Sequence, residues 1–174
     1  MSFSPLITMF YLAALIAVIA SIKVVTRKNT VHALLYLVVS LIAVAVCFYL
    51  MGAPFAAGLE VIVYAGAILV LFVFAIMLFG LREDETHYAP QNRGFSGWIG
   101  PVCLSVILLI ELVYTINHQG IQQQLLATVV DAKRVGILLY GPYLLAVEIA
   151  SFLLLTGLVA AYHFAKTTNH GGPA

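Results

Sequence analysis

The stretch LEVIVYAGAILVLFVFAIML, residues 59–78, has the composition of a membrane-spanning helix but carries a carboxyl group, a phenol and a glycine in its first turns. About 20 consecutive apolar residues are needed to cross a hydrocarbon core roughly 30 Å thick, and this stretch meets that length. Ionisable side chains are costly inside a membrane and mark candidate functional sites. Glu60, Tyr64 and Gly66 therefore make this segment the first candidate for function.

The rest of the chain has the same character. Hydrophobic residues make up 63% of its 174 residues and charged residues 9%, and its mean hydropathy is +1.09. These values exclude a soluble globular domain. Five apolar stretches are long enough to span a membrane, at residues 6–22, 31–51, 55–80, 98–117 and 142–164. The strand alternation of a membrane barrel is absent, so the sequence predicts an all-α membrane protein with five transmembrane helices in one domain, residues 1–174.

The distribution of basic residues predicts the orientation, because Lys and Arg are retained on the cytoplasmic side of short loops. With the N-terminus outside, the inner loops and tail carry Lys23, Arg27, Lys28, Arg82, Arg93 and Lys166, and the outer loops carry Lys133 and Arg134. We therefore expect the N-terminus outside and the C-terminus in the cytoplasm. The first apolar stretch has no basic residue ahead of it and no small-residue cleavage site, so we expect it to remain as a helix.

Three carboxyl groups lie inside the predicted spans, at Glu60, Glu111 and Glu148. At a rise of about 1.5 Å per residue, each lies about 8–9 Å from the outer end of its helix, so the three share a depth. A carboxyl group in such a place is protonated, paired with a base or next to water. Each residue is either a protonated glutamate that hydrogen-bonds between helices or a member of a proton path.

The third predicted span, residues 55–80, is longer than the membrane requires. As an ideal α-helix it would measure about 39 Å, so it must tilt, protrude or distort. Glu60 and Tyr64 are four residues apart and share a face, and Ala65, Gly66 and Ala67 follow with almost no side-chain bulk. Small residues in mid-membrane indicate either close helix packing or a π-bulge, which is rare but concentrated at functional sites.

The sequence contains few residues that indicate cofactor or metal binding. Cys47 and Cys103 are isolated inside spans and are interpreted as small buried hydrophobic residues. His32 and His163 lie near the cytoplasmic ends of their helices, where they could serve as axial ligands of a haem. The sequence contains no glycine-rich phosphate loop and no nucleophile motif, and its loops are too short for a soluble catalytic domain.

Three stretches resemble a known family. They are VHALLYLVVSLIAVAVCFYLMGAPFAAGLEVIVYAGAILVLFVFAIML (residues 31–78), WIGP (residues 98–101) and AKRVGILLYGPYLLAVEIASFLLLTGLVAAYHF (residues 132–164). Together they are similar to subunit J of the bacterial proton-translocating NADH:quinone oxidoreductases, respiratory complex I. This subunit is the counterpart of mitochondrial NADH dehydrogenase subunit six. The resemblance covers most of the chain.

The resemblance implies roles for the residues singled out above. It implies a π-bulge around Tyr64–Gly66 that passes between π and α forms during turnover. It places Glu60 close to the chain of charged residues that links the quinone cavity to the proton-pumping subunits. Glu148 matches the family pattern and is assigned a supporting role, whereas the position of Glu111 is apolar in the family and the residue is interpreted as a protonated structural glutamate.

The function implied is that of a membrane-arm subunit in the bacterial inner membrane, which helps couple quinone reduction to proton translocation. The chain itself would bind neither NADH, FMN nor iron-sulfur clusters, and these cofactors and the quinone would lie on other subunits. Its partners would be the other membrane-arm and peripheral-arm subunits and the lipid bilayer. Two other classes use the same residues, namely a small transporter or antiporter component and a haem-binding membrane anchor.

Overall fold

The computed structural model describes residues 5–27, 29–80, 96–117 and 129–167, and these ranges are helical with no strand. The elements are α1 (Pro5–Thr26), α2 (Thr30–Leu50), α3 (Pro54–Leu59), the π-helix η1 (Glu60–Ile68), α4 (Leu69–Gly80), α5 (Ser96–Asn117), α7 (Ala132–Leu139) and α8 (Leu144–Thr167). Among them, five continuous helical segments are long and apolar enough to cross a membrane, with α3, η1 and α4 forming one of the five. The predicted all-α class and the five spans are confirmed.

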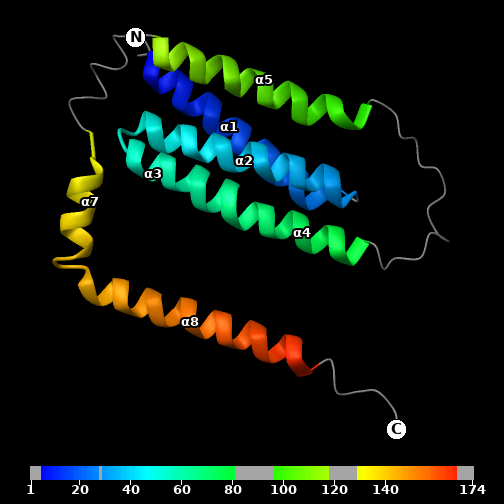
Figure 1. Ribbon diagram of the computed structural model, residues 1–174. Coiled ribbons are helices and arrows are strands. Elements are labelled where there is room, and N and C mark those ends of the chain that lie inside the picture. Colours follow the sequence, from blue (N-terminus) through cyan, green and yellow to red (C-terminus); the bar gives the residue numbers. More distant parts are fainter. Residues whose placement is uncertain (1–4, 28, 81–95, 118–128, 168–174) are drawn as a thin grey trace. The chain divides into compact units, whose positions relative to one another are not determined.

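Helices α1 and α2 form an antiparallel hairpin with small residues at its interface (Figure 1). The Asn29 side chain ends the turn by accepting hydrogen bonds from the backbone N–H groups of Val31 and His32, which have no partner inside the helix. Along the hairpin, alanines at positions 13, 17, 20 and 43 are buried and allow close approach. Ser21 and Ser40 share a hydrogen bond of 2.8 Å across the interface, so two polar side chains in an apolar region satisfy each other.

A tight turn connects α2 to the third membrane helix. Gly52 has a φ of 79°, a conformation that residues with a side chain rarely adopt, and Pro54 occupies the first turn of α3. The Gly52 carbonyl group accepts a hydrogen bond of 2.8 Å from the backbone N–H of Val130. The segment α3–η1–α4 then returns alongside α2 (Figure 1).

Helix α5 packs against both α1 and α2 and completes the core. Leu108 of α5 is buried in the same cluster as Ile16 of α1 and Val46 of α2. At the other end of α5, Gly100 lies against the Tyr36 hydroxyl group so closely that an added Cβ atom would overlap it. The core is therefore a three-helix contact of α1, α2 and α5.

The chain divides by its own contacts into two compact units, Met1–Val130 and Asp131–Ala174. The second unit consists of α7 and α8, and the Asp131 side chain caps α7 by accepting from the backbone N–H of Ala132. The last span was predicted from residue 142, but α8 begins at Leu144 because residues 140–143 form the turn between the two helices. The single domain stays a prediction.

Candidate functional site

The third membrane helix changes its hydrogen-bonding pattern where the polar residues lie. The π-helix η1 runs over nine residues, from Glu60 to Ile68. At its end the backbone N–H of Leu69 donates to the Tyr64 carbonyl group, five residues earlier, which is the spacing of a π-helix. The predicted π-bulge is confirmed, and it is longer than the three residues expected because it begins at Glu60.

The side chains of η1 lie at its surface, and none of its residues is buried. Glu60 and Ala65 are half-buried, Gly66 is exposed, and the Tyr64 side chain is 51% exposed. In the described part of the chain, neither the Glu60 carboxyl group nor the Tyr64 hydroxyl group has a hydrogen-bond partner. Within this chain, the small residues therefore do not form the tight contact of the packing alternative, and both polar groups are open to neighbours outside it.

Gly66 occupies a crowded place in the backbone of η1. A Cβ atom added at Gly66 would lie 3.2 Å from the Val61 carbonyl oxygen, closer than an ordinary van der Waals contact. Gly58, in the α-helical part of the same membrane helix, has nothing within 4 Å of its added Cβ atom outside its own turn of the helix. Because Gly66 has no side chain, it avoids a close contact with the Val61 carbonyl group across the wide turn of η1.

Glu111 lies in a different environment, between α5 and α1. Its side chain is only 4% exposed, and neither carboxyl oxygen has a hydrogen-bond partner. The nearby Thr115 hydroxyl group is 2.8 Å from the backbone carbonyl oxygen of Glu111 and 3.5 Å from the sulfur atom of Met9. Cys47 of α2 is within electrostatic reach of the carboxyl group. The nearest groups therefore leave the Glu111 carboxyl group unsatisfied.

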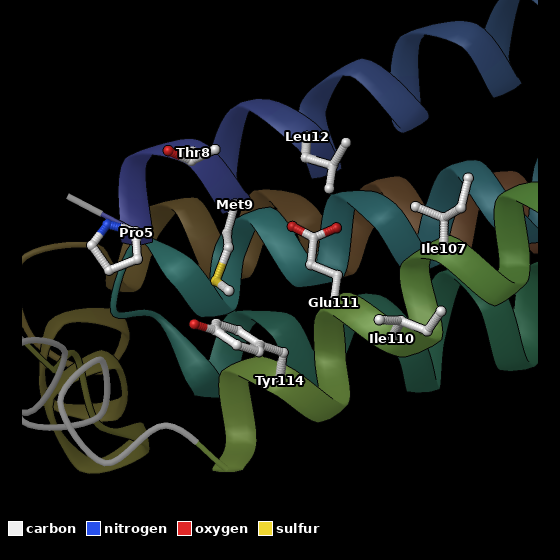
Figure 2. A pocket seen from close by; sticks show the side chains of 8 residues that line it. All are labelled: Pro5, Thr8, Met9, Leu12, Ile107, Ile110, Glu111 and Tyr114. Carbon is white, nitrogen blue, oxygen red and sulfur yellow. The ribbon is translucent and has the colours of Figure 1, made fainter. Parts of the chain in front are cut away.

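The Glu111 side chain lines a cavity of about 520 Å³. Figure 2 shows its carboxyl group pointing from α5 toward α1, between Met9 and Leu12. Ile107, Ile110 and Tyr114 continue the α5 wall, and Pro5 and Thr8 continue the α1 wall. The pocket is open on one side and mainly apolar, and both carboxyl oxygens of Glu111 are buried rather than exposed in it.

Glu60 and Glu111 lie toward the same end of the first unit, where α3 begins and α5 ends (Figure 1). Each is about 9 Å from the nearby end of its helix at 1.5 Å per residue, and the common depth of the three glutamates in the membrane stays a prediction. No hydrogen bond or ion pair connects them among the described residues. Glu148 belongs to the second unit, where it is exposed on α8. Its predicted supporting role stays a prediction.

The structure also shows the surroundings of one histidine and two cysteines that the sequence singled out. The His32 ring packs edge-on against Trp98, with 6.0 Å between the ring centres. Cys47 is half-buried, as interpreted, but Cys103 is exposed within the chain. The prediction of a buried Cys103 is therefore wrong for this chain alone. Lys28, Arg82 and Arg93, which contribute to the predicted orientation, lie outside the described residues.

Sequence reasoning missed the contact between Tyr36 and Gly100. The Arg27 guanidinium group lies over the Tyr36 ring, 5.6 Å from its centre, and donates to the Tyr36 hydroxyl group at 3.5 Å. WIGP, the motif at residues 98–101, contains Gly100, but a motif does not reveal which side chain a glycine accommodates. Only the packing of α2 on α5 brings these residues together.

Five apolar helices, one of them π-helical where its carboxyl and phenol groups lie, define a multi-pass helical membrane protein. Comparison with known proteins specifies the family. Residues 20–164 match the family described as NADH-ubiquinone/plastoquinone oxidoreductase chain 6. The chain belongs to this family, so the resemblance predicted from the sequence is confirmed.

Several relatives carry the name NADH-quinone oxidoreductase subunit J. The protein of Escherichia coli is 50% identical over 165 residues, which cover 93% of this chain and 88% of the relative. The protein of Pseudomonas aeruginosa is 50% identical over 157 residues, or 90% of this chain and 95% of the relative. That of Buchnera aphidicola subsp. Schizaphis graminum is 45% identical over 157 residues, or 90% and 96%. The match therefore extends over nearly the whole of both chains.

Proposed function

We propose that the chain, as a membrane-arm subunit of a proton-translocating NADH:quinone oxidoreductase, helps couple quinone reduction to proton translocation, with its third helix as a conformational gate. The observation that carries the proposal is the nine-residue π-helix η1, which contains Glu60, Tyr64 and Gly66 together. A π-helix has poorer intrinsic stability than an α-helix and is concentrated at functional sites. Membership of the family indicates the complex to which the chain belongs, and η1 is the helical segment whose hydrogen bonding can change.

The change in the gate is a shift of one residue in the helical register. Converting a wide turn to an α-turn rotates the side chains on one side of it by about 100°. Tyr64, Phe72 and Phe74 are each more than half exposed. Their rotation carries bulky rings across any water path next to the helix, and Leu69, which is buried in the same helix α4, moves with Phe72 and Phe74.

Glu60 and Tyr64 connect the register to protonation. Glu60 is the first residue of η1, and its backbone N–H contacts the carbonyl groups of Ala56 and Ala57 in the α-helical part. Tyr64 supplies the carbonyl group that receives the last five-residue hydrogen bond, from Leu69. The half-buried Glu60 is therefore the residue at which backbone hydrogen bonding changes from α to π, and a change in its charge acts at this junction. For Glu148 of α8 we keep the supporting role that the family resemblance implies.

The remaining features follow from the sequence and the family. The N-terminus faces outside and the C-terminus the cytoplasm, an orientation supported by the six basic residues on one side against two on the other. The chain resides in the bacterial inner membrane and contacts other membrane-arm and peripheral-arm subunits. FMN, iron-sulfur clusters and quinone are held by those subunits, and the chain adds no redox centre of its own.

Structures of the purified complex at rest and during turnover test the gate. We expect η1 to be π-helical in one state and α-helical in the other, with Tyr64 rotated between them. A π-helix that is unchanged in every state contradicts the gate, even if the chain is present in the complex. Purification through a tag on this chain tests membership separately, because a transporter would be active alone and a haem anchor would show a haem absorbance band.

A further inference from the structure

We propose that α7 lies along the membrane surface and binds the headgroups of anionic phospholipids through Lys133 and Arg134. Both basic side chains are exposed. Among the residues that the structure describes, neither side chain makes a hydrogen bond or an ion pair. The two residues belong to the second unit, so the proposal does not depend on the π-helix η1 or on the proposed gate.

Helix α7 is set across the direction of the membrane helix that follows it. The two helices belong to one compact unit, and Figure 1 shows α7 turned sharply away from the line of α8. The turn at residues 140–143 makes this change of direction, with the backbone N–H groups of Gly141 and Tyr143 donating to the Leu138 carbonyl group. Because α8 is long and apolar enough to cross the membrane, a helix turned away from its start extends along the membrane surface.

Two tyrosines place the turn at the level of the lipid headgroups. Tyr140 ends α7 and Tyr143 directly precedes α8, and their side chains are 78% and 57% exposed. Tyrosine is enriched at membrane–water interfaces because its ring is apolar and its hydroxyl group is polar. Tyr140 and Tyr143 at the start of a span therefore indicate the interface, and α7 lies at the same level.

The residues of α7 divide between an apolar face and the basic pair. Val135, Leu138 and Leu139 are three and four residues apart and so share one face of the helix. Leu138 and Leu139 are exposed within this chain, as expected of side chains that contact the boundary of the acyl chains. At about 100° per residue, Lys133 lies opposite this face and Arg134 at its border. Long basic side chains in these places keep their charged ends in the headgroup layer.

The charge of this surface specifies the kind of lipid. The described part of the second unit has two acidic residues, Asp131 and Glu148. The Asp131 carboxyl group is engaged at the start of α7, where it accepts from the backbone N–H of Ala132 at 2.7 Å, and Glu148 lies inside the span. The basic pair is thus left for an external anion. Each basic residue near an anionic membrane surface strengthens attraction about fivefold, which corresponds to about 1 kcal/mol.

Photolabelling of the purified complex in nanodiscs tests the site. Two probes carry the same diazirine at the glycerol end of one acyl chain and differ in the headgroup, one being phosphatidylglycerol and the other phosphatidylcholine. Labelled positions are mapped by mass spectrometry of peptides cut after aromatic residues, so that changes at basic residues leave the peptides the same. We expect phosphatidylglycerol to label α7 and residues 140–143 at least about fivefold more than phosphatidylcholine does.

Three variants separate charge from other effects. Lys133→Gln combined with Arg134→Gln should bring the two probes to nearly equal labelling. Lys133→Arg combined with Arg134→Lys keeps both charges and should retain the preference for phosphatidylglycerol. Lys166→Gln is the matched control, because it removes one positive charge from the last turn of α8 and should leave the labelling of α7 unchanged.

Four outcomes overturn the proposal. Equal labelling by both probes in the wild-type complex would show that lipid covers α7 without recognition of charge, and this comparison stands even if the double Gln variant fails to assemble. A preference that persists in the double Gln variant would show that the basic pair is not its source. Absence of labelling by either probe would indicate that a partner subunit covers α7. Suppression by millimolar inorganic phosphate at constant ionic strength would indicate a site for a soluble anion.

Discussion

Replacing Gly66 with Ala adds one methyl group inside η1. The new Cβ atom would lie 3.2 Å from the Val61 carbonyl oxygen, which has to move by a few tenths of an ångström. Val61 is five residues earlier, so the contact belongs to the wide turn. Closing that turn to an α-turn changes the contact, and Ala therefore favours the α form over the π form.

The size of the effect follows from this contact. Adding a methylene to a well-packed place costs about 1–3 kcal/mol, and a contact that yields by a few tenths of an ångström lies at the lower end of that range, about 1 kcal/mol. A bias of about 1 kcal/mol changes the ratio of π to α forms about fivefold, because RT is about 0.6 kcal/mol. Gly66→Val adds a β-branched side chain, which is stiffer and opposes close packing, and should act in the same direction more strongly.

The matched control is Gly58→Ala. It adds the same methyl group to the same membrane helix, but in α3, where nothing outside its own turn of the helix lies within 4 Å of the new Cβ atom. In membranes with equal amounts of assembled complex, we expect Gly66→Ala to lower quinone reduction and proton pumping while Gly58→Ala leaves both near wild type. Electron transfer from NADH to a water-soluble acceptor should be unchanged in both variants, since neither substitution touches a redox centre.

Two results would refute this reasoning. If Gly58→Ala lowers pumping as much as Gly66→Ala, the effect arises from a methyl group on this helix in general and not from the wide turn. If Gly66→Val pumps normally, the residues from Ala65 to Ala67 are only a packing surface for neighbouring subunits. A structure of the Gly66→Ala complex provides the direct measurement, with η1 expected to be α-helical in a larger share of the particles.

Three other predictions follow from the site, the orientation and the core. Glu60→Gln keeps hydrogen bonding but removes titration, so it should lower pumping about fivefold or more in a fully assembled complex, whereas wild-type rates would show that the charge is dispensable. A reporter that works only outside the cytoplasm should be active when fused after Gln122 and inactive after His170, and the reverse pattern would invert the orientation. Gly100→Ala should cost about 1–3 kcal/mol and reduce assembly because its Cβ overlaps the Tyr36 hydroxyl group, and Tyr36→Phe in the same chain should restore assembly in part. An equal loss in the double variant would exclude that contact.

The membrane spans could be predicted because their physical requirement is local. A run of about 20 apolar residues satisfies the thickness of the bilayer wherever it occurs in the chain. The ends of the spans are less well determined, and the last one was placed from residue 142 because Pro142 and Tyr143 have no charge that separates them from α8. In the structure these two residues belong to the turn after α7. Apolar composition therefore identifies a span better than it identifies the residue at which the helix begins.

The π-helix was predicted only as one of two alternatives until a family resemblance decided between them. Excess length and the small residues at positions 65–67 are compatible with close packing as well as with a wide turn. An α-helical and a π-helical segment differ in whether a backbone N–H bonds the carbonyl group four or five residues back. The run of small residues in the sequence is compatible with either. The π-helix begins at Glu60 and therefore includes the residue that carries the carboxyl group. In the sequence, Glu60 and the small residues are separate features.

The three glutamates show what a sequence lacks for the assignment of a role. Counting residues along each helix gave Glu111 and Glu148 the same depth, and both appeared as single carboxyl groups in apolar spans. Glu111 is buried because Met9 and Leu12 of α1 lie beside it, whereas Glu148 is exposed on α8. An exposed carboxyl group in a span can pair with a group of another subunit, whereas the buried carboxyl group of Glu111 has no partner among the described residues of its own fold. The role of a membrane glutamate is thus determined by its lateral neighbours, which are tertiary and quaternary facts, and measurements on the assembled complex are the ones that can decide it.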